Sequence, residues 1–122
     1  MGVLNDNKKK ILNNFVKFVK KELDLKSVPT ISIQNTRDGL KTTANYDYTK
    51  ENKIIKVYGK GRALVDIMRS VAHEMVHHKQ YEQGRLEVKP PDIGGEIEDE
   101  ANAKAGQFIK MYAKEDPTIY DD

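Results

Sequence analysis

The strongest constraint on this sequence is a pair of histidines that lie four residues apart inside a segment with helical periodicity. From Arg62 to Gln83, apolar residues recur at spacings of three and four, which is the pattern of an amphipathic helix: Leu64, Ile67, Met68, Val71, Ala72, Met75 and Val76. Residues four apart lie one above the other on a helix, so the rings of His73 and His77 can reach one common ion. The segment is therefore predicted to be a helix that carries a metal site.

The residue that follows the first of these histidines is a glutamate. Glu74 is rotated by about 100° from His73 around the helix axis, so its carboxylate can stand beside the ion and take a proton from water without binding the metal. The pattern HExxH thus combines two neutral imidazoles, which suit zinc, with a general base, and zinc-dependent hydrolysis requires this set. The alternative is that both histidines are solvated or salt-bridged on a polar helix face.

The composition limits what can complete such a site. The 122 residues include three histidines and no cysteine. The third histidine, His78, points about 100° away from His77 around the helix. A catalytic zinc usually has three protein ligands and an open position, so the third ligand must be a carboxylate.

The best-placed carboxylate is Glu98, near the start of the next predicted helix. Asn102 lies four residues later on the same face, where its amide would orient a ligand histidine. Glu96 and Glu100 remain rivals, because the macrodipole favours any carboxylate in the first turn of a helix. The sequence therefore favours Glu98 without excluding its neighbours.

The rest of the chain predicts a single domain, residues 1–122, with an α+β fold. The expected order is a helix over 6–23, strands over 28–34, 42–48 and 53–58, the helix over 62–83, a loop over 85–95 and a helix over 96–113. The last two strands suit an antiparallel hairpin, so the small three-stranded sheet should be mostly antiparallel. Residues 116–122 are expected to form a flexible or cleft-covering tail.

Charge and hydropathy restrict the class of protein. No apolar run is long enough to span a membrane or to serve as a secretory signal, so we expect a cytoplasmic protein without a membrane partner. The net charge of +2 is too small to indicate nucleic acid, although residues 1–70 carry 15 basic against 7 acidic residues and residues 71–122 carry 6 against 12. We interpret the lysine-rich first helix as a solvated face rather than as a site for an acidic partner.

Over residues 62–113, the sequence resembles the gluzincins, which are zinc metallopeptidases. The resemblance rests on His73-Glu74-x-x-His77 followed by Glu98-x-Glu100-Ala101-Asn102. In that group the third zinc ligand is a glutamate on a following "glutamate helix", usually with Asp or Asn four residues later. The compact arrangement is similar to minigluzincins and to ImmA/IrrE-type peptidase domains, which implies a minimal zincin-like domain.

The resemblance assigns roles by position. It implies that His73, His77 and Glu98 bind Zn²⁺, that Glu74 is the general base, and that Asn102 orients a ligand histidine. The implied activity is hydrolysis of peptide bonds in a polypeptide substrate, which binds along an antiparallel edge strand, either 53–58 or 42–48. The sequence does not decide which of these two strands lies at the edge.

Two departures from the family keep other functions open. Larger gluzincins stabilise the oxyanion with a His or Tyr from a further domain; no histidine is left here, and no single tyrosine stands out among Tyr46, Tyr48, Tyr58, Tyr81 and Tyr112. Some minigluzincins are latent because a C-terminal segment covers the cleft. The alternatives are therefore a zinc-binding domain that is latent or non-catalytic, with a regulatory or protein-interaction role, and a basic-helix binding module in which HExxH is incidental.

Overall fold

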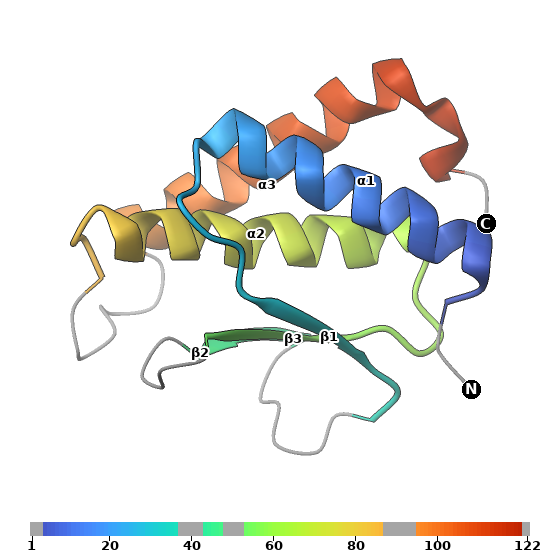
Figure 1. Cartoon of the computed structure of the whole chain (residues 1–122), viewed down its shortest axis with the longest axis horizontal. Helices are drawn as coiled ribbons and strands as arrows, with labels where there is room; N and C mark the ends of the chain where they lie inside the picture. The colour runs from blue at the N-terminus through green and yellow to red at the C-terminus, as the bar shows by residue number, and fades with distance from the viewer. Residues whose placement is uncertain (1–3, 37–42, 48–52, 87–94, 121–122) are drawn as a thin grey trace.

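A computed structural model of the chain describes residues 4–36, 43–47, 53–86 and 95–120 (Figure 1). Its elements, in order, are α1 (Asp6–Leu23), β1 (Thr30–Gln34), β2 (Ala44–Asp47), β3 (Ile54–Tyr58), α2 (Leu64–Glu82), α3 (Glu96–Glu115) and a 3₁₀ helix, η1 (Pro117–Tyr120). The predicted α+β class and the order of its elements are confirmed. Most of the predicted loop over 85–95 lies outside the described residues.

The helix ends follow from local hydrogen bonds. Asn5 caps α1, because its side-chain oxygen accepts from the backbone N–H of Lys8 at 2.8 Å. Gly84 follows the end of α2 and adopts the left-handed conformation with φ +73°. The N–H of Arg85 then donates to the carbonyl of Gln80 at 2.8 Å, which closes a Schellman motif. This turn places the Arg85 side chain beside the start of α3.

The sheet has the strand order β1-β3-β2 and is mixed. The predicted hairpin is confirmed, since β2 and β3 are antiparallel with Tyr46 opposite Ile55. β1 is parallel to β3, with Ile31 opposite Ile55, so the expectation of a mostly antiparallel sheet holds for one of the two strand pairs. The alternation of apolar residues along a strand specifies its faces and leaves the direction of its neighbour open. Of the two candidate edge strands, β3 is central and β2 lies at an edge.

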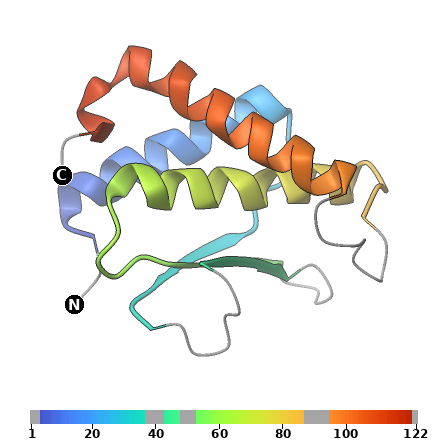
Figure 2. The same ribbon diagram turned by 180° about the vertical axis from the view of Figure 1, so that it is seen from behind.

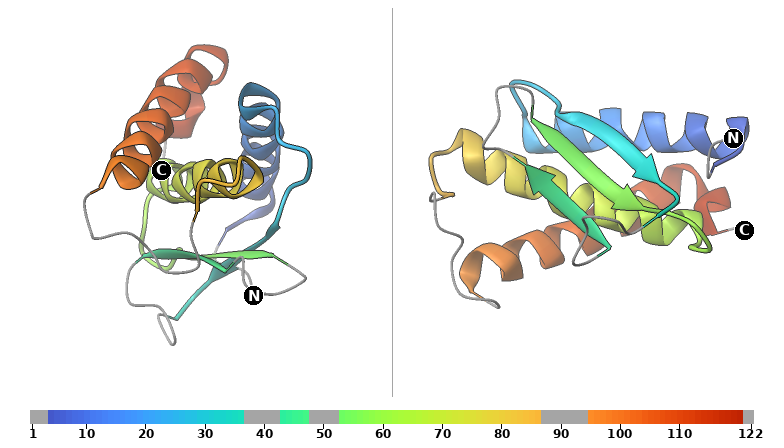
Figure 3. Two further views of the ribbon diagram at one scale, coloured as in Figure 1. Left: turned by 90° about the vertical axis from the view of Figure 1, so that its left-hand side faces the viewer. Right: turned by 90° about the horizontal axis from the view of Figure 1, so that it is seen from below.

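The helix α2 is the central element of the fold. It lies between the sheet on one side and α1 and α3 on the other (Figures 1 and 2). Met68 and Met75 of α2 and Ile55 of β3 are fully buried. In Figure 3, β2 lies at the edge of the sheet nearer α3, and β1 lies at the edge nearer α1. The two edges therefore have different surroundings.

The C-terminal segment packs against the helices as far as the structure describes it. Ile119 in η1 is 1% exposed, and η1 contacts α2 and α3. It follows the end of α3, whose 20 residues span about 30 Å from the turn that carries Glu98. Residues 117–120, part of the predicted tail, thus follow the end of α3 that is opposite to Glu98.

Among the helices that the structure describes, none combines the length and the apolar character needed to cross a membrane.

An aromatic cluster joins α1 and α3. The ring of Tyr112 lies 5.3 Å from that of Phe15 and 5.4 Å from that of Phe18, in edge-to-face contacts. Such contacts add to the free energy of burying the rings.

Replacement of Phe15, which has 0% exposure, should strongly destabilise the fold. We expect Phe15→Ala to lower the free energy of unfolding by about 3 to 5 kcal/mol, because it removes buried surface and leaves a cavity. Urea denaturation followed by circular dichroism measures this change. Lys17→Ala on the exposed face of α1 is the control, and a similar loss in both variants would contradict the assignment of Phe15 to the core.

Candidate metal site

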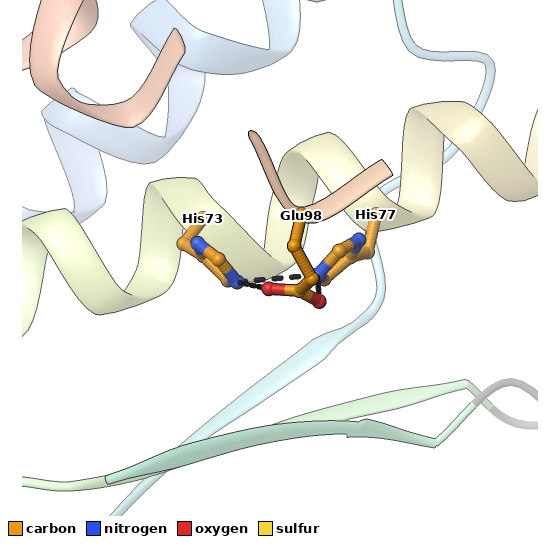
Figure 4. Close-up of side chains that lie close together, drawn as sticks. All are labelled: His73, His77 and Glu98. Atoms are coloured by element: carbon orange, nitrogen blue, oxygen red, sulfur yellow. Dashed lines mark hydrogen bonds and ion pairs between the residues drawn. The ribbon is translucent and has the colours of Figure 1, made fainter. Parts of the chain in front are cut away.

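Three side chains from two helices converge on one point. His73 and His77 lie one turn apart on α2, and Glu98 reaches them from the first turn of α3 (Figure 4). The Nε2 atoms of the two histidines are 3.1 Å apart. The Glu98 carboxylate spans both, with Oε2 3.2 Å from Nε2 of His73 and Oε1 2.8 Å from Nε2 of His77. Their candidate ligand atoms all lie within 4.8 Å of one another.

This arrangement fits a zinc ion in both chemistry and size. Two imidazole nitrogens and one carboxylate oxygen form a donor set that catalytic zinc sites use. Ligand atoms about 2.0 to 2.2 Å from a tetrahedral ion are separated by roughly 3.3 Å. The two histidine Nε2 atoms are 3.1 Å apart, which is close to that value, and each lies within 3.2 Å of a different oxygen of Glu98. The predicted ligand set is thus brought together.

Gln80 fixes the orientation of His77. Its Oε1 lies 2.8 Å from Nδ1 of His77, while its Nε2 donates to the carbonyl of Ile97 at 3.0 Å and to Oε1 of Glu100 at 2.8 Å. Since both contacts of the Gln80 nitrogen are acceptors, the amide oxygen must face the imidazole. His77 then carries its proton on Nδ1, which leaves Nε2 as the free lone pair.

Gln80 is buried although glutamine is most often a surface residue. The side chain has 0% exposure and links α2 to α3. Its position offered a usable signal, because Gln80 lies four residues after the buried Val76 and so extends the apolar stripe of α2. A glutamine on a buried stripe needs hydrogen-bond partners, which His77 and α3 supply.

Asn102 contacts the other histidine. This residue, predicted to orient a ligand, hydrogen-bonds the His73 side chain from α3. Burial lowers the pKa of His73, and the neighbouring His77 lowers it further, whereas Glu98 and Asn102 oppose the change. The resulting preference for a neutral imidazole suits a metal ligand. The side-chain amide of Gln80 thus holds His77, and that of Asn102 acts on the pKa of His73.

Glu74 stands beside the three ligands rather than among them. Its Oε2 lies 3.9 Å from Nε2 of His73, and its side chain is 10% exposed. Burial raises the pKa of Glu74 to about 8, and the negative charge of Glu98 contributes in the same direction. A cation held by the neighbouring group would lower this pKa, because an opposite charge stabilises the carboxylate. The position agrees with that predicted for a general base.

The rival carboxylates are placed elsewhere. Glu100 accepts from Gln80 and forms an ion pair with Nη1 of Arg85 at 2.9 Å, and the hydrogen bond from Gln80 is the main reason that its pKa is lowered. Glu96 is exposed and does not belong to the converging group of the described residues. Glu98 is the acidic residue of the first α3 turns that meets both histidines.

The third histidine belongs to a separate network on another side of α2. His78 is 2% exposed, and its Nε2 lies 3.2 Å from Oε2 of Glu82, four residues later on the same helix. The same nitrogen lies 3.1 Å from the carbonyl of Ser27, and Nδ1 meets the hydroxyl of Tyr46. His78 thus fastens α2 to β2 and to the segment before β1.

The tyrosines considered for stabilising an oxyanion have structural contacts of their own. Tyr46 hydrogen-bonds His78, Tyr81 stacks on His78 with ring centroids 6.3 Å apart, and Tyr112 packs in the aromatic cluster. Tyr58 ends β3, where its carbonyl accepts from Arg62 at 2.8 Å, and Tyr48 lies outside the described residues.

Comparison of the chain with protein-family models, with curated proteins and with solved structures finds no match. Inference about function therefore rests on the geometry of the site.

Replacement of Gln80 tests its role as the link between α2 and α3. We expect Gln80→Leu to lower the free energy of unfolding by about 1 to 3 kcal/mol, because it leaves the buried partners of the amide without hydrogen bonds. Urea denaturation in the presence of a chelator measures this effect without any contribution from metal. Gln107→Leu on the exposed face of α3 is the control, and an equal change in both variants would argue against the link.

Proposed function

We propose that the chain is a zinc-dependent peptidase in which His73, His77 and Glu98 hold the metal. The observation that carries the proposal is the convergence of the three ligand atoms with the Glu74 carboxylate beside them. Side-chain amides on both histidines add support, because orientation of metal-binding imidazoles by hydrogen bonds is general in zinc sites.

In the proposed reaction, the chain's own residues position the metal and move a proton. A bound zinc ion supplies Lewis acidity, which polarises a carbonyl group and makes water acidic enough to lose a proton near neutral pH. Glu74 accepts that proton and later donates it to the leaving amine. Gln80 and Asn102 keep the imidazoles aimed at the metal while this occurs.

A polypeptide substrate fits the surroundings of the group. β2 lies at the edge of the sheet on the α3 side, and Figure 4 shows His73 and His77 on the side of α2 that faces the sheet. An extended peptide beside β2 would thus pass near the ligands. This position favours β2 over β3 as the strand that aligns the substrate.

Metal content tests the first half of the proposal. We expect about one zinc ion per chain after dialysis, because a site with three protein ligands retains its metal. His73→Ala, His77→Ala and Glu98→Ala should each lose it, as measured by elemental analysis of the purified protein.

Asp99→Ala is the matched control, since Asp99 is an exposed acidic residue in the same first turn of α3. It should retain zinc. Loss of zinc in Asp99→Ala to the same extent as in Glu98→Ala would mean that general negative charge at the helix start, rather than ligation by Glu98, attracts the ion.

Glu74→Gln tests the second half of the proposal. We expect this variant to bind zinc as the parent does, because Glu74 is not among the three converging ligands. Its cleavage of dye-labelled casein should fall by about 10²- to 10⁴-fold, since the amide cannot accept the proton. Initial rates and zinc content are measured on the same samples.

Two outcomes would revise the proposal in different ways. A parent protein that binds zinc but leaves casein intact would indicate a latent or non-catalytic zinc domain. Cleavage that persists in Glu74→Gln would show that the activity does not use this carboxylate.

A further inference from the structure

We propose that the groove between α1 and β1 binds an extended acidic polypeptide segment, which pairs with β1 as a fourth strand of the sheet. The groove lies at the α1 edge of the sheet, whereas Glu98 and the strand β2 lie on the α3 side (Figure 3). This binding site is separate from the metal group and does not depend on catalysis.

The groove has a volume of about 500 Å³ and a mostly aliphatic lining. α1 supplies one wall and β1 with the residue before it supplies the other, through Leu12, Val16, Pro29, Ile31 and Ile33. Val16, Ile31 and Ile33 are half-buried, so part of this apolar surface still contacts water. Covering it with apolar side chains of a partner would be favourable.

The backbone of β1 presents hydrogen-bonding groups along this edge. The N–H of Thr30 donates to the carbonyl of Lys53 at 3.0 Å, and the carbonyl of Gln34 accepts from the N–H of Gly59 at 2.9 Å. In a parallel ladder, alternate residues direct their N–H and C=O groups toward the same neighbour, so those of Ile31 and Ile33 point away from β3.

These outward groups are available for an additional strand. Within the described part of the chain, β1 pairs with β3 alone, and the backbone of Ile31 and Ile33 has no hydrogen-bond partner. An edge of this kind is a template for a further strand, in which main-chain hydrogen bonds supply affinity and side-chain pockets supply specificity. The side chains of Ile31 and Ile33 line the groove, so apolar residues at alternate positions of the partner would cover it.

Charge along α1 indicates the character of the partner. Lys9 lines the groove, and helical periodicity places Lys20 within about 20° of Lys9 around the axis. Both lysines are exposed, and α1 carries six lysines against two acidic residues. A segment with acidic residues flanking its apolar positions would be attracted to this face.

The same features favour a polypeptide over a single-stranded nucleic acid. Proteins bind single strands by stacking bases on aromatic side chains, and the lining of the groove is aliphatic. The outward backbone groups of Ile31 and Ile33 match the alternating donors and acceptors of a β-strand.

Amide hydrogen exchange tests the pairing directly. The probe is a synthetic peptide with alternating valine and threonine at its centre and glutamates at both ends, added to the full chain in the presence of a chelator. We expect exchange at the Ile31 and Ile33 amides to slow by about tenfold. The Ser32 amide, which already faces β3, should change little.

Charge reversal tests the lysines with a matched control. Lys9→Glu/Lys20→Glu should weaken peptide binding by about tenfold at low salt, and added salt should reduce the difference. Lys10→Glu/Lys21→Glu makes the same change in net charge on another face of α1 and should weaken binding by about twofold or less.

Several results would overturn the proposal. The proposal is contradicted if the peptide fails to bind, if Ser32 is protected in place of Ile31 and Ile33, or if the two lysine pairs have equal effects. Tighter binding of an oligothymidine than of the peptide would identify a nucleic-acid groove instead. Protection of Ile31 and Ile33 that rises with protein concentration alone would show that a second copy of the chain occupies this edge.

Discussion

Four polar side chains are buried on α2, and three of them, His77, His78 and Gln80, have hydrogen-bond partners that tie the helix to its neighbours. Glu74, His77, His78 and Gln80 are all at most 8% exposed. Burial of an unpaired polar group costs about 1 to 3 kcal/mol, comparable to a large part of the stability of a small domain. In the described part of the chain, no fully buried side-chain nitrogen or oxygen lacks a hydrogen bond. The central helix can therefore be buried on several sides only because its neighbours supply matching groups.

The partners lie in two directions, because successive residues of a helix differ by about 100°. One nitrogen of His77 meets Glu98 of α3, and the other meets Gln80 of its own helix. His78 faces β2 and the segment before β1, where Tyr46 and Ser27 meet it. Adjacent histidines thus link α2 to α3 and to β2. The side chains of His73, His77 and Glu98 are therefore held near one another by contacts within the protein.

The two edges of the sheet lie beside different helices. The β2 edge lies on the side of α3 and the metal group, and the β1 edge borders the lysine-bearing helix α1. The α1 side is basic, because α1 carries six lysines against two acidic residues.

Local chemistry explains which features were predictable. The amphipathic periods and the turn residues predicted three helices and three strands, and α2 ends at Gly84 because only the left-handed conformation closes its Schellman motif. The parallel pairing of β1 with β3 was not predictable, because the alternation of apolar residues shows which face of a strand is buried. It does not show which strand lies beside it or in which direction that strand runs. The burial of Gln80 also depended on α3, which lies beyond a long loop in the sequence.

The sequence by itself determined that His73 and His77 share a face with Glu74 beside them, because a four-residue spacing within one helix fixes that geometry. It also determined that a carboxylate must complete any three-ligand zinc site, because the chain has no cysteine and its third histidine points elsewhere. Only the tertiary structure decided between Glu96, Glu98 and Glu100. That choice depends on the rotation and distance of α3 relative to α2, which are set by packing and by the hydrogen bonds of Gln80 rather than by periodicity within either helix.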